Sequence, residues 1–272
     1  MTGIFDSHAH YFDVRFEREA EGGADAILTE IMPSPVSYIL NVGTDLHTSA
    51  LAIEQAARYA GMYAAVGIHP GDCHYLPDAR EALDGLVTML GTAEDRKRRK
   101  IVALGEIGLD YHFQQYGEIP MDRQKEQYFF ESQMELAERL DLPVIIHDRE
   151  AHGDCFETVL RYPNVRGVFH SFSGSAEMAK ELTRRGWYIS FSGTLTFKNA
   201  ERVRAAAQAV PRELLLVETD APYLAPHPMR GKLNHSGLLI HTLDTLSALW
   251  DCTPQEAADT TATNAKSLFG IS

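Results

Sequence analysis

The sequence predicts an α/β fold, a single parallel (β/α)8 or TIM barrel that spans residues 1–272. Short β-branched and apolar runs alternate with longer amphipathic segments along the chain, and eight of these runs are followed by helical sequence. No composition break, low-complexity linker or obvious internal repeat divides the chain. An open doubly wound sheet is the alternative, but it would normally need a glycine-rich phosphate loop after its first strand. The chain has His8-Ala9-His10-Tyr11-Phe12 at that place, which favours the barrel.

The apolar runs mark the expected strands, and turn and capping signals mark the helices between them. In chain order the expected strands cover residues 4–10, 36–43, 63–70, 101–110, 143–149, 166–172, 187–193 and 214–221. The clearest helical segment covers residues 122–140, where apolar side chains recur at helical spacing. Ser175 is suited to cap the next helix, and Gly186 to end it as a left-handed residue. The last helix is expected to open with a capping box at Thr253-Pro254-Gln255-Glu256.

Residues of metal-binding types stand at the ends of five of the expected strands, where the chemistry of a barrel gathers. They are His8 and His10 on the first strand, Glu106 on the fourth, His147 on the fifth, His170 on the sixth and Asp220 on the eighth. His8 and His10 lie on the same face of an extended segment because strand side chains alternate. A single zinc-like ion needs three protein ligands, whereas six are enough for two ions that share a bridging carboxylate. We assign the bridge to Glu106.

Two further acids precede these residues by one strand period. Asp6 lies two residues before His8, and Glu218 two residues before Asp220. Both are expected to point into the barrel one layer below the metals, although a local bulge could turn Glu218 outward. Because buried carboxylates need partners, each is expected to accept a hydrogen bond from the outer nitrogen of a ligating histidine.

Composition limits the possible functions. A formal net charge of −13 argues against wrapping a long run of duplex but not against a nucleic-acid substrate held locally through metal ions. The cationic run Arg96–Lys100 is interpreted as a solvated connector. Cys73, Cys155 and Cys252 are far apart and form no CxxC pair, so free thiols are expected. Without a signal-like or membrane-spanning segment, the expected location is cytoplasmic, with no membrane association.

An ordered set of short motifs resembles the TatD family of metal-dependent deoxyribonucleases, from Ile4 to about Leu268. The motifs are Phe5-Asp6-x-His8-x-His10, Gly67-Ile68-His69-Pro70, Gly105-Glu106-Ile107-Gly108-Leu109-Asp110-Tyr111, Ile146-His147-Asp148-Arg149, His170-Ser171-Phe172-Ser173-Gly174 and Glu218-Thr219-Asp220-Ala221-Pro222-Tyr223-Leu224. The resemblance implies a metal-dependent hydrolase barrel of the amidohydrolase superfamily that removes nucleotides from DNA, often from 3′ ends.

The predicted function is hydrolysis of phosphodiester bonds by a metal-activated water. The resemblance implies that the substrate is DNA and that the enzyme acts as a 3′–5′ exonuclease on single strands, whereas the residues alone leave DNA against RNA and exo- against endonuclease action open. Two divalent ions (Mg, Mn or Zn) would serve as cofactors. Asp220 is expected to bind an ion and to orient or deprotonate the water, with Glu106 as the second catalytic residue. Arg149 and Arg230 could clamp phosphate, and His69 could contact phosphate or protonate a leaving group. Ion pairing at the surface for the arginines, and a structural core role for His69, are the alternatives.

Two departures from the family pattern concern loops at the active face. Family members with Arg-Gly-Lys here usually continue to Asn-x-Pro, but this chain reads Arg230-Gly231-Lys232-Leu233-Asn234-His235-Ser236 and lacks the proline. His112 stands where a second aromatic residue is frequent. These departures bear on substrate preference more than on the metal site. The remaining histidines considered, His74, His112, His152, His227, His235 and His241, are not at expected strand ends, and most are expected to face solvent.

The nearest rival function is a binuclear amidohydrolase acting on a small amide, ester or lactone, because polarising a carbonyl and activating water need the same parts. Enzymes of that type commonly use a carboxylated lysine at the end of the fourth strand, and this chain has Glu106 there, which points away from cyclic-amide hydrolases. A non-catalytic metal-binding scaffold is the third possibility. The oligomeric state is not predicted.

Overall fold

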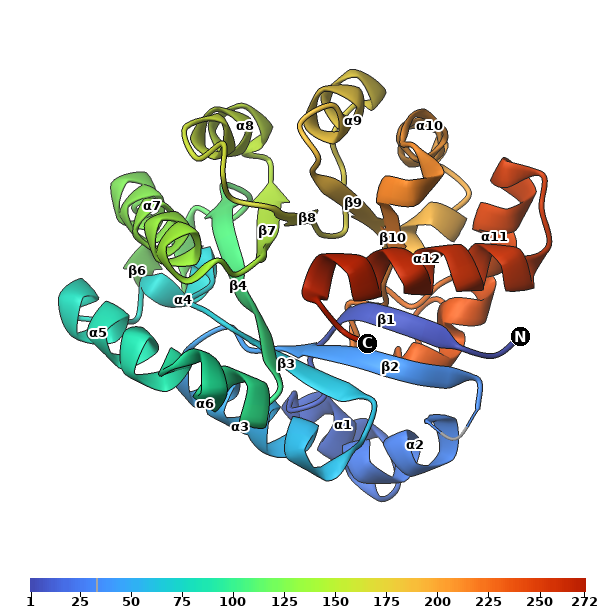
Figure 1. The fold of residues 1–272 in the computed structure, drawn as a ribbon, viewed down its shortest axis with the longest axis horizontal. Coiled ribbons are helices and arrows are strands. Elements are labelled where there is room, and N and C mark those ends of the chain that lie inside the picture. Colours follow the sequence, from blue (N-terminus) through green and yellow to red (C-terminus); the bar gives the residue numbers. More distant parts are fainter. Residues whose placement is uncertain (33) are drawn as a thin grey trace.

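Eight parallel strands form one curled sheet in the computed structural model, which describes residues 1–32 and 34–272 (Figure 1). The strands are β1 (Ile4–Ala9), β2 (Val36–Val42), β3 (Met62–Val66), β4 (Ile101–Asp110), β7 (Val144–Arg149), β8 (Gly167–Phe169), β9 (Tyr188–Phe191) and β10 (Leu215–Val217), adjacent in that order. The sheet closes because Ala9 pairs with Ala221 and the Asp220 amide donates to the carbonyl of His8 at 2.9 Å. The predicted single-domain (β/α)8 barrel is therefore confirmed.

Helices follow the strands and cover the outside of the barrel. They are α1 (Val14–Glu19), α2 (Gly23–Ile31), α3 (Leu46–Arg58), α4 (Pro70–Cys73), α5 (Ala79–Leu90), α6 (Ala93–Arg98), α7 (Arg123–Leu140), α8 (His152–Leu160), α9 (Ala176–Thr183), α10 (Glu201–Ala209), α11 (Leu239–Trp250) and α12 (Pro254–Phe269). Three 3₁₀ turns, η1 (Gly193–Thr196), η2 (Arg212–Leu214) and η3 (Ser236–Leu238), lie in the connections. Among the described residues, no helix has both the length and the apolar composition that crossing a bilayer would require.

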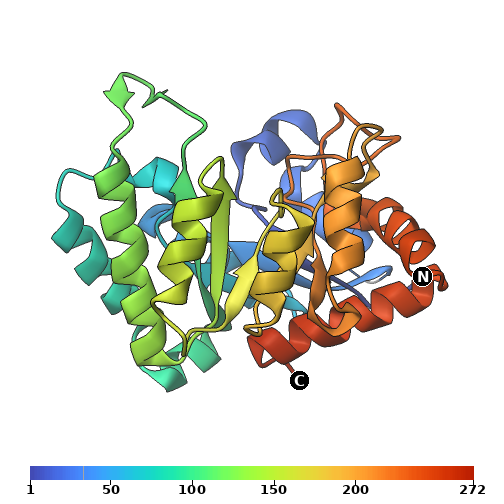
Figure 2. The ribbon, with the colours of Figure 1, turned by 90° about the horizontal axis from the view of Figure 1, so that it is seen from above.

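Helix α12 closes the end of the barrel where the strands begin. Leu268 and Phe269 of this helix pack with inward-facing strand residues such as Phe5, Leu40 and Leu216 in one fully apolar cluster. Figure 2 shows α12 along one side of the molecule and the loops that follow the strands on the opposite side. Because burial of apolar area drives folding, this end is a packed core, and only the opposite end is left for polar side chains.

Most of the local signals are where the sequence places them. Asp122 caps α7, Ser175 caps α9, and Thr253 and Glu256 form the capping box of α12. Gly186 adopts the expected left-handed conformation with φ +82°, but α9 already ends at Thr183, so the glycine lies in the turn that follows rather than at the helix end.

Several strand ends differ from the predicted boundaries. β3 stops at Val66, so His69 is not on a strand but is the N-cap of α4. β8 and β10 are short, which leaves His170 and Asp220 in the loops just beyond them. A small antiparallel hairpin of β5 (Gln115–Tyr116) and β6 (Ile119–Pro120) was not predicted.

The cationic run is also more structured than a solvated connector. Arg96 to Arg98 form the last turn of α6, where cations favour the negative end of the helix dipole. The Arg99 guanidinium donates to the carbonyl of Met89 near the end of α5. The ammonium of Lys100 donates to the carbonyl of Ala56 in α3 and to those of the two residues after that helix. These side chains hold helix ends, because the last carbonyls of a helix lack partners within it.

Candidate metal centre

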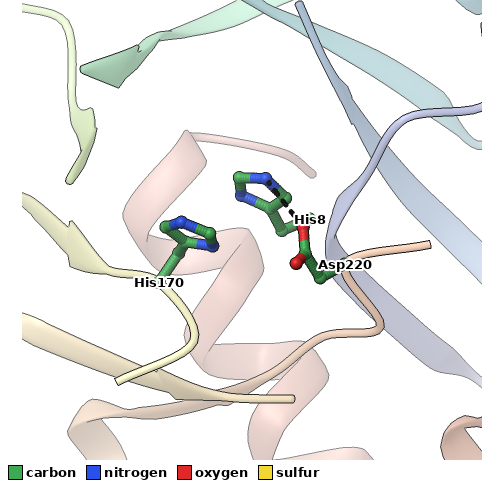
Figure 3. A group of neighbouring side chains, drawn as sticks. All are labelled: His8, His170 and Asp220. Atoms are coloured by element: carbon green, nitrogen blue, oxygen red, sulfur yellow. Dashed lines mark ion pairs between the residues drawn. The ribbon is translucent and has the colours of Figure 1, made fainter. Parts of the chain in front are cut away.

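All six predicted ligands converge at the open end of the barrel. His8 and His10 come from the end of β1, Glu106 from within β4, and His147 from β7, while His170 and Asp220 follow β8 and β10. The side chains of His8, His170 and Asp220 point toward one another (Figure 3). The rings of His8 and His170 stack with their centroids 4.1 Å apart. Parallel strands bring their carboxyl ends to one face of the barrel, so residues far apart in the sequence meet there.

Glu106 lies between two groups of histidines and turns one oxygen toward each. Its Oε2 is 3.5 Å from His8 Nε2 and 3.7 Å from His10 Nε2. Its Oε1 is 2.7 Å from His147 Nδ1 and 2.9 Å from His170 Nε2. We name His8, His10 and Asp220 the His8 half of the site, and His147 and His170 the His147 half. The two halves share Glu106.

The His8 half is compact and is oriented mainly by the backbone. The Nε2 atoms of His8 and His10 are 3.1 Å apart, and Asp220 Oδ1 is 3.3 Å from His10 Nε2. His10 Nδ1 lies 2.6 Å from the carbonyl oxygen of Val42. Because a carbonyl only accepts, Nδ1 carries a ring proton, and Nε2 is the nitrogen that faces the centre of the site.

In the His147 half, carboxylates lie against the outer nitrogens of both histidines. Asp110 Oδ2 is 3.3 Å from His147 Nε2, and Glu218 Oε1 is 3.2 Å from His170 Nδ1. Glu218 Oε1 also accepts from the amide of Ser171 at 2.7 Å. The inward position and the histidine partner predicted for Glu218 are thus present.

β4 and β7 approach closely enough to allow this contact because Gly108 has no side chain. It has φ +141°, and a Cβ atom there would meet the carbonyl oxygen of His147 at 2.0 Å. Glycine is the residue that tolerates both this backbone angle and this distance. In the register of β4 with β7, Gly108 pairs with His147. Asp110, two residues further along β4, pairs with Arg149.

Asp220 has an unusual backbone conformation that aims its carboxylate. Its φ is +58°, in the left-handed region that few residues other than glycine adopt. The amide of Asp220 bonds to His8, and the amide of His10 donates to Ala221 at 2.7 Å. The conformation costs on the order of 1–3 kcal/mol and is held by this pairing with β1, as is common at functional sites.

The pKa values show a centre that is both buried and charged. Burial opposes ionisation of Glu106, but its interactions with the imidazoles of His170, His69 and His8 hold its pKa well below the usual range. Burial also opposes ionisation of Asp220, and the hydrogen bond with His10 lowers its pKa. Burial disfavours the charged form of His147, yet its bonds with Asp110 and Glu106 raise its pKa to about 9. Both acids are therefore available as anions.

This set of donors fits a divalent cation. Each of three overlapping groups, His8 with His170 and Asp220, His8 with His10 and Glu106, and His69 with Glu106 and His147, has its donor atoms within 4.8 Å of one another. Imidazole and carboxylate are common ligands of divalent ions of the first transition row. The Nε2 atoms of His8 and His10 face each other at 3.1 Å beside carboxylates. An ion held by both nitrogens would explain this arrangement. The residues present therefore suit a metal.

Asp6 is buried beneath His8, but its partners are not the predicted ones. It accepts from the amide and hydroxyl of Thr219 and from the hydroxyl of Ser236, at 2.5–2.9 Å. The expectation that it supports the outer nitrogen of a histidine is wrong, and His8 Nδ1 has no hydrogen-bond partner among the described residues. Burial raises the pKa of Asp6 to about 7 in spite of these bonds. Asp6 instead ties β1 to the chain after β10 and to η3.

Ser236 occupies the place where the family usually has proline. Besides its bond to Asp6, its amide donates to the hydroxyl of Tyr11 at 2.9 Å. A proline could make neither contact, because it has no amide hydrogen and no hydroxyl. Serine in place of proline at position 236 therefore adds polar contacts beneath the His8 half.

His69 lies beside Glu106 but is not suited to protonate a leaving group as imidazolium. Its Nδ1 accepts from the amide of Gly71 at 2.9 Å, which leaves the ring proton on Nε2, 3.5 Å from Glu106 Oε1. Burial lowers its pKa to about 3. At neutral pH the ring is therefore a neutral hydrogen-bond donor that faces the centre.

The two predicted phosphate clamps lie further out, against aromatic rings. The Arg149 guanidinium is 5.1 Å from the ring centroid of Phe113, and that of Arg230 is 4.1 Å from Phe197. Both arginines are exposed, and neither is in an ion pair among the described residues. Their charges are thus free to meet an anion.

Sequence reasoning missed a buried pair behind the His147 half. His74, which was expected to face solvent with most of the other histidines, is buried, and its Nε2 is 2.9 Å from Glu126 Oε1 of α7. The other oxygen of Glu126 accepts from the amide of Asp110 at 2.9 Å. Asp110 itself was also missed as a partner of His147. No local pattern marks these residues, because their partners are distant in the sequence.

Comparison with known proteins agrees with this fold. The family model for TatD-related DNases matches residues 5–270. The metal-dependent hydrolase YabD of Bacillus subtilis is 37% identical over 98% of this chain and 99% of its own length. The metal-dependent hydrolase MG009 of Mycoplasma genitalium is 34% identical over 97% of this chain and 98% of its own. The crystal structure of YjjV, a TatD homologue from Escherichia coli, superposes with a TM-score of 0.86 at 29% identity and covers 99% of this chain and 98% of that one.

A (β/α)8 barrel with this cluster at the carboxyl ends of its strands defines a metal-dependent hydrolase. Within that class, the chain belongs to the TatD family.

Proposed function

We propose that the chain is a deoxyribonuclease that hydrolyses phosphodiester bonds with two divalent metal ions, as a 3′–5′ exonuclease on single strands. The observation that carries this proposal is the position of Glu106, whose two oxygens face different pairs of histidines. A single ion would need only one of those groups.

In this proposal, His8, His10 and Asp220 would hold one ion, His147 and His170 would hold the other, and the Glu106 carboxylate between the two groups would serve both. The depressed pKa of Glu106 and of Asp220 supports this role, because ligands must be deprotonated to bind. When bound, Mg, Mn or Zn ions would lower the pKa of a coordinated water and neutralise charge on the phosphoryl oxygens.

The protein residues then have separate tasks. Asp220 would orient the attacking water and accept its proton. The neutral ring of His69 donates its Nε2 hydrogen to a phosphoryl oxygen, since its Nδ1 is already used as an acceptor. Arg149 and Arg230 contact phosphates of the strand on either side, where bidentate bonds suit a guanidinium.

DNA is the proposed substrate for two reasons. The matching family model is named for DNases. The exposed arginines beside aromatic rings also offer the combination of charge and stacking that single strands use. An acidic protein with few such contacts should bind a strand locally rather than along a great length.

The test is to incubate metal-stripped protein with single-stranded DNA and RNA labelled at the 3′ or 5′ end, adding back each metal separately. The expected result is release of the 3′ label from DNA as mononucleotide, and its loss in the His8→Ala variant. Glu135→Gln, on the exposed side of α7, is a matched control that should keep activity. If no nucleic acid is degraded under any metal while a simple ester, amide or lactone is, the nuclease proposal fails.

A further inference from the structure

A cavity lies between the loops that follow β9 and β10, at the same end of the barrel as the six-residue cluster. Its volume is about 560 Å³, within the usual range for small-ligand sites. The two loops are in contact: the amide of His227 donates to the hydroxyl of Thr196 at 2.7 Å. A Cβ atom at Gly193 would meet the carbonyl oxygen of Leu224 at 2.1 Å, so only glycine permits this approach. The wall of the cavity is therefore formed by two loops that pack directly against each other.

The cavity, which we call the loop pocket, has walls of two kinds. Phe197 and Val203 supply apolar and aromatic surface. Lys198, His227 and Arg230 supply cationic and polar groups, and all three are exposed. Arg230 packs on the ring of Phe197 at 4.1 Å, which orders the guanidinium at the edge of the pocket. A ligand that fits both walls has a flat apolar part and an anionic part.

The local charge is opposite in sign to that of the whole protein. Segments 194–204 and 225–235 contain five Lys or Arg residues and one acid, Glu201, so their net charge is +4, whereas the chain carries −13. Part of this charge serves the fold, because Arg204 donates to the carbonyls of Leu195 and Phe197. Lys198 and Arg230 have no such task in the described structure and are available to an anion. The pocket is thus an electropositive place on an acidic molecule.

A chain of hydroxyl groups connects the wall of the pocket to the residue that follows His170 in the candidate metal centre. Thr194, in the pocket wall, is 3.1 Å from the hydroxyl of Ser192, which is 2.9 Å from the hydroxyl of Ser171. Ser171 directly follows His170 in the chain, and its amide bonds to Glu218 at 2.7 Å. A polymer bound at the cluster would reach the pocket with its neighbouring unit.

We propose that the loop pocket binds one nucleotide of the DNA strand, adjacent to the nucleotide whose phosphodiester is hydrolysed. This inference rests on the proposed deoxyribonuclease function and assigns a position for the strand in it. Lys198 and Arg230 bind the backbone phosphate, and the base lies against Phe197 and Val203. A free phosphate would use only the cationic wall, and a small ester or lactone would use only the apolar one.

The experiment measures binding without cleavage, by fluorescence anisotropy of a fluorescein-labelled single-stranded DNA 10-mer in EDTA. The Lys198→Gln/Arg230→Gln variant is expected to bind about 10-fold or more weakly than the wild type, because two charge-assisted contacts are lost. The Arg80→Gln/Lys97→Gln variant removes the same charge from exposed positions in α5 and α6 and is the control. Equal Kd values for the two variants would overturn the proposal.

A fully abasic 10-mer separates the two walls, because it has the same phosphates but no bases. It should bind the wild type about 5-fold or more weakly than the normal strand. Phe197→Ala should weaken binding of the normal strand by a larger factor than binding of the abasic strand, because the abasic strand loses only the ordering of Arg230. A Phe197→Ala variant that binds both strands like the wild type would contradict a stacking role, and thermal melting of each variant checks that it is folded.

Cleavage kinetics distinguish a failure of the pocket from a failure of the nuclease. With metal present, Lys198→Gln/Arg230→Gln should raise KM for DNA by about the same factor as Kd while kcat changes little, since the ligands are intact. Wild-type and variant proteins that degrade DNA with the same KM overturn the pocket and leave the nuclease in place. A wild-type protein that degrades no DNA overturns the function on which the pocket rests.

Discussion

The His8 half and the His147 half of the site share Glu106 but are supported by different kinds of group. The outer nitrogen of His10 meets a backbone carbonyl, and that of His8 has no partner among the described residues. The outer nitrogens of His147 and His170 both meet carboxylates. A carboxylate behind a histidine makes the ring a more basic ligand. We therefore expect the His147 half to hold its ion more tightly, and the ion in the His8 half to exchange more easily.

The largest effect is expected from Glu106→Gln, because it changes the one residue that both halves share. Turnover should fall by at least about 1,000-fold, since two ions together stabilise the transition state by several kcal/mol. The number of metal ions that remain bound per chain after gel filtration should also fall, because Glu106 is a ligand in both halves. The Glu135→Gln control should keep activity and metal. Turnover of Glu106→Gln within tenfold of the wild type would show that the carboxylate does not bridge.

Asp220→Asn should separate the halves. Turnover is expected to fall by about 100- to 10,000-fold, because the proton acceptor for the attacking water is lost. One ion per chain should remain in the His147 half, which Asp220 does not support in this account. Steady-state kinetics and metal analysis of the same sample measure both quantities. A turnover within a few-fold of the wild type would exclude the role of Asp220, and loss of both ions would contradict the difference between the halves.

Glu218→Gln tests why the His147 half should be the tighter one. Replacing the carboxylate behind His170 is expected to weaken binding of the tighter ion by about 10- to 100-fold. Asp110→Asn should act in the same way through His147. Competition with a fluorescent chelator gives the affinities, and Glu157→Gln, exposed on α8, is the control. If only the weaker ion is affected, the comparison between the halves is reversed.

Ser236→Ala should have the smallest effect, and the effect should be on the stability of the fold and not on the metal site. Its hydroxyl donates to Asp6, which ties β1 to the segment after β10 without contacting the ring nitrogens. Burial raises the pKa of Asp6 to about 7, so at pH 8 the carboxylate is ionised and the lost bond leaves it less satisfied. The free energy of unfolding should fall by about 1–3 kcal/mol at that pH. Urea denaturation measures this, and a drop in metal affinity with unchanged stability would assign Asp6 to the metal site instead.

The six clustered residues could be predicted because each lies toward the carboxyl end of an expected strand. Parallel strands bring such ends to one face, so the barrel prediction also placed His8, Glu106 and His170 near one another. The inward positions of Asp6 and Glu218, one layer below the six clustered residues, followed from the two-residue period of a strand. Their partners did not follow, because the period gives the direction of a side chain but not what lies opposite. Asp6 meets Thr219 and Ser236, whereas Glu218 meets His170.

Other features depend on contacts that no local pattern encodes. Asp110 lies four residues beyond Glu106 on a strand whose register with β7 shifts between Leu104 and Ile107, so counting along β4 does not show that it meets His147. The burial of His74 depends on Glu126 in a distant helix. The loop pocket forms only where the segments after β9 and β10 pack together. Each of these requires the closed barrel before the neighbours are known.

The central claim is that Glu106 lies between two ions, and anomalous diffraction from crystals soaked in Mn²⁺ tests it most directly. The account predicts two peaks in the anomalous difference map, one beside His8 and His10 and one beside His147 and His170, with the carboxylate of Glu106 between them. At limiting Mn²⁺ the peak beside His147 should be the stronger. A single peak, or peaks that Glu106 does not contact, would contradict the account.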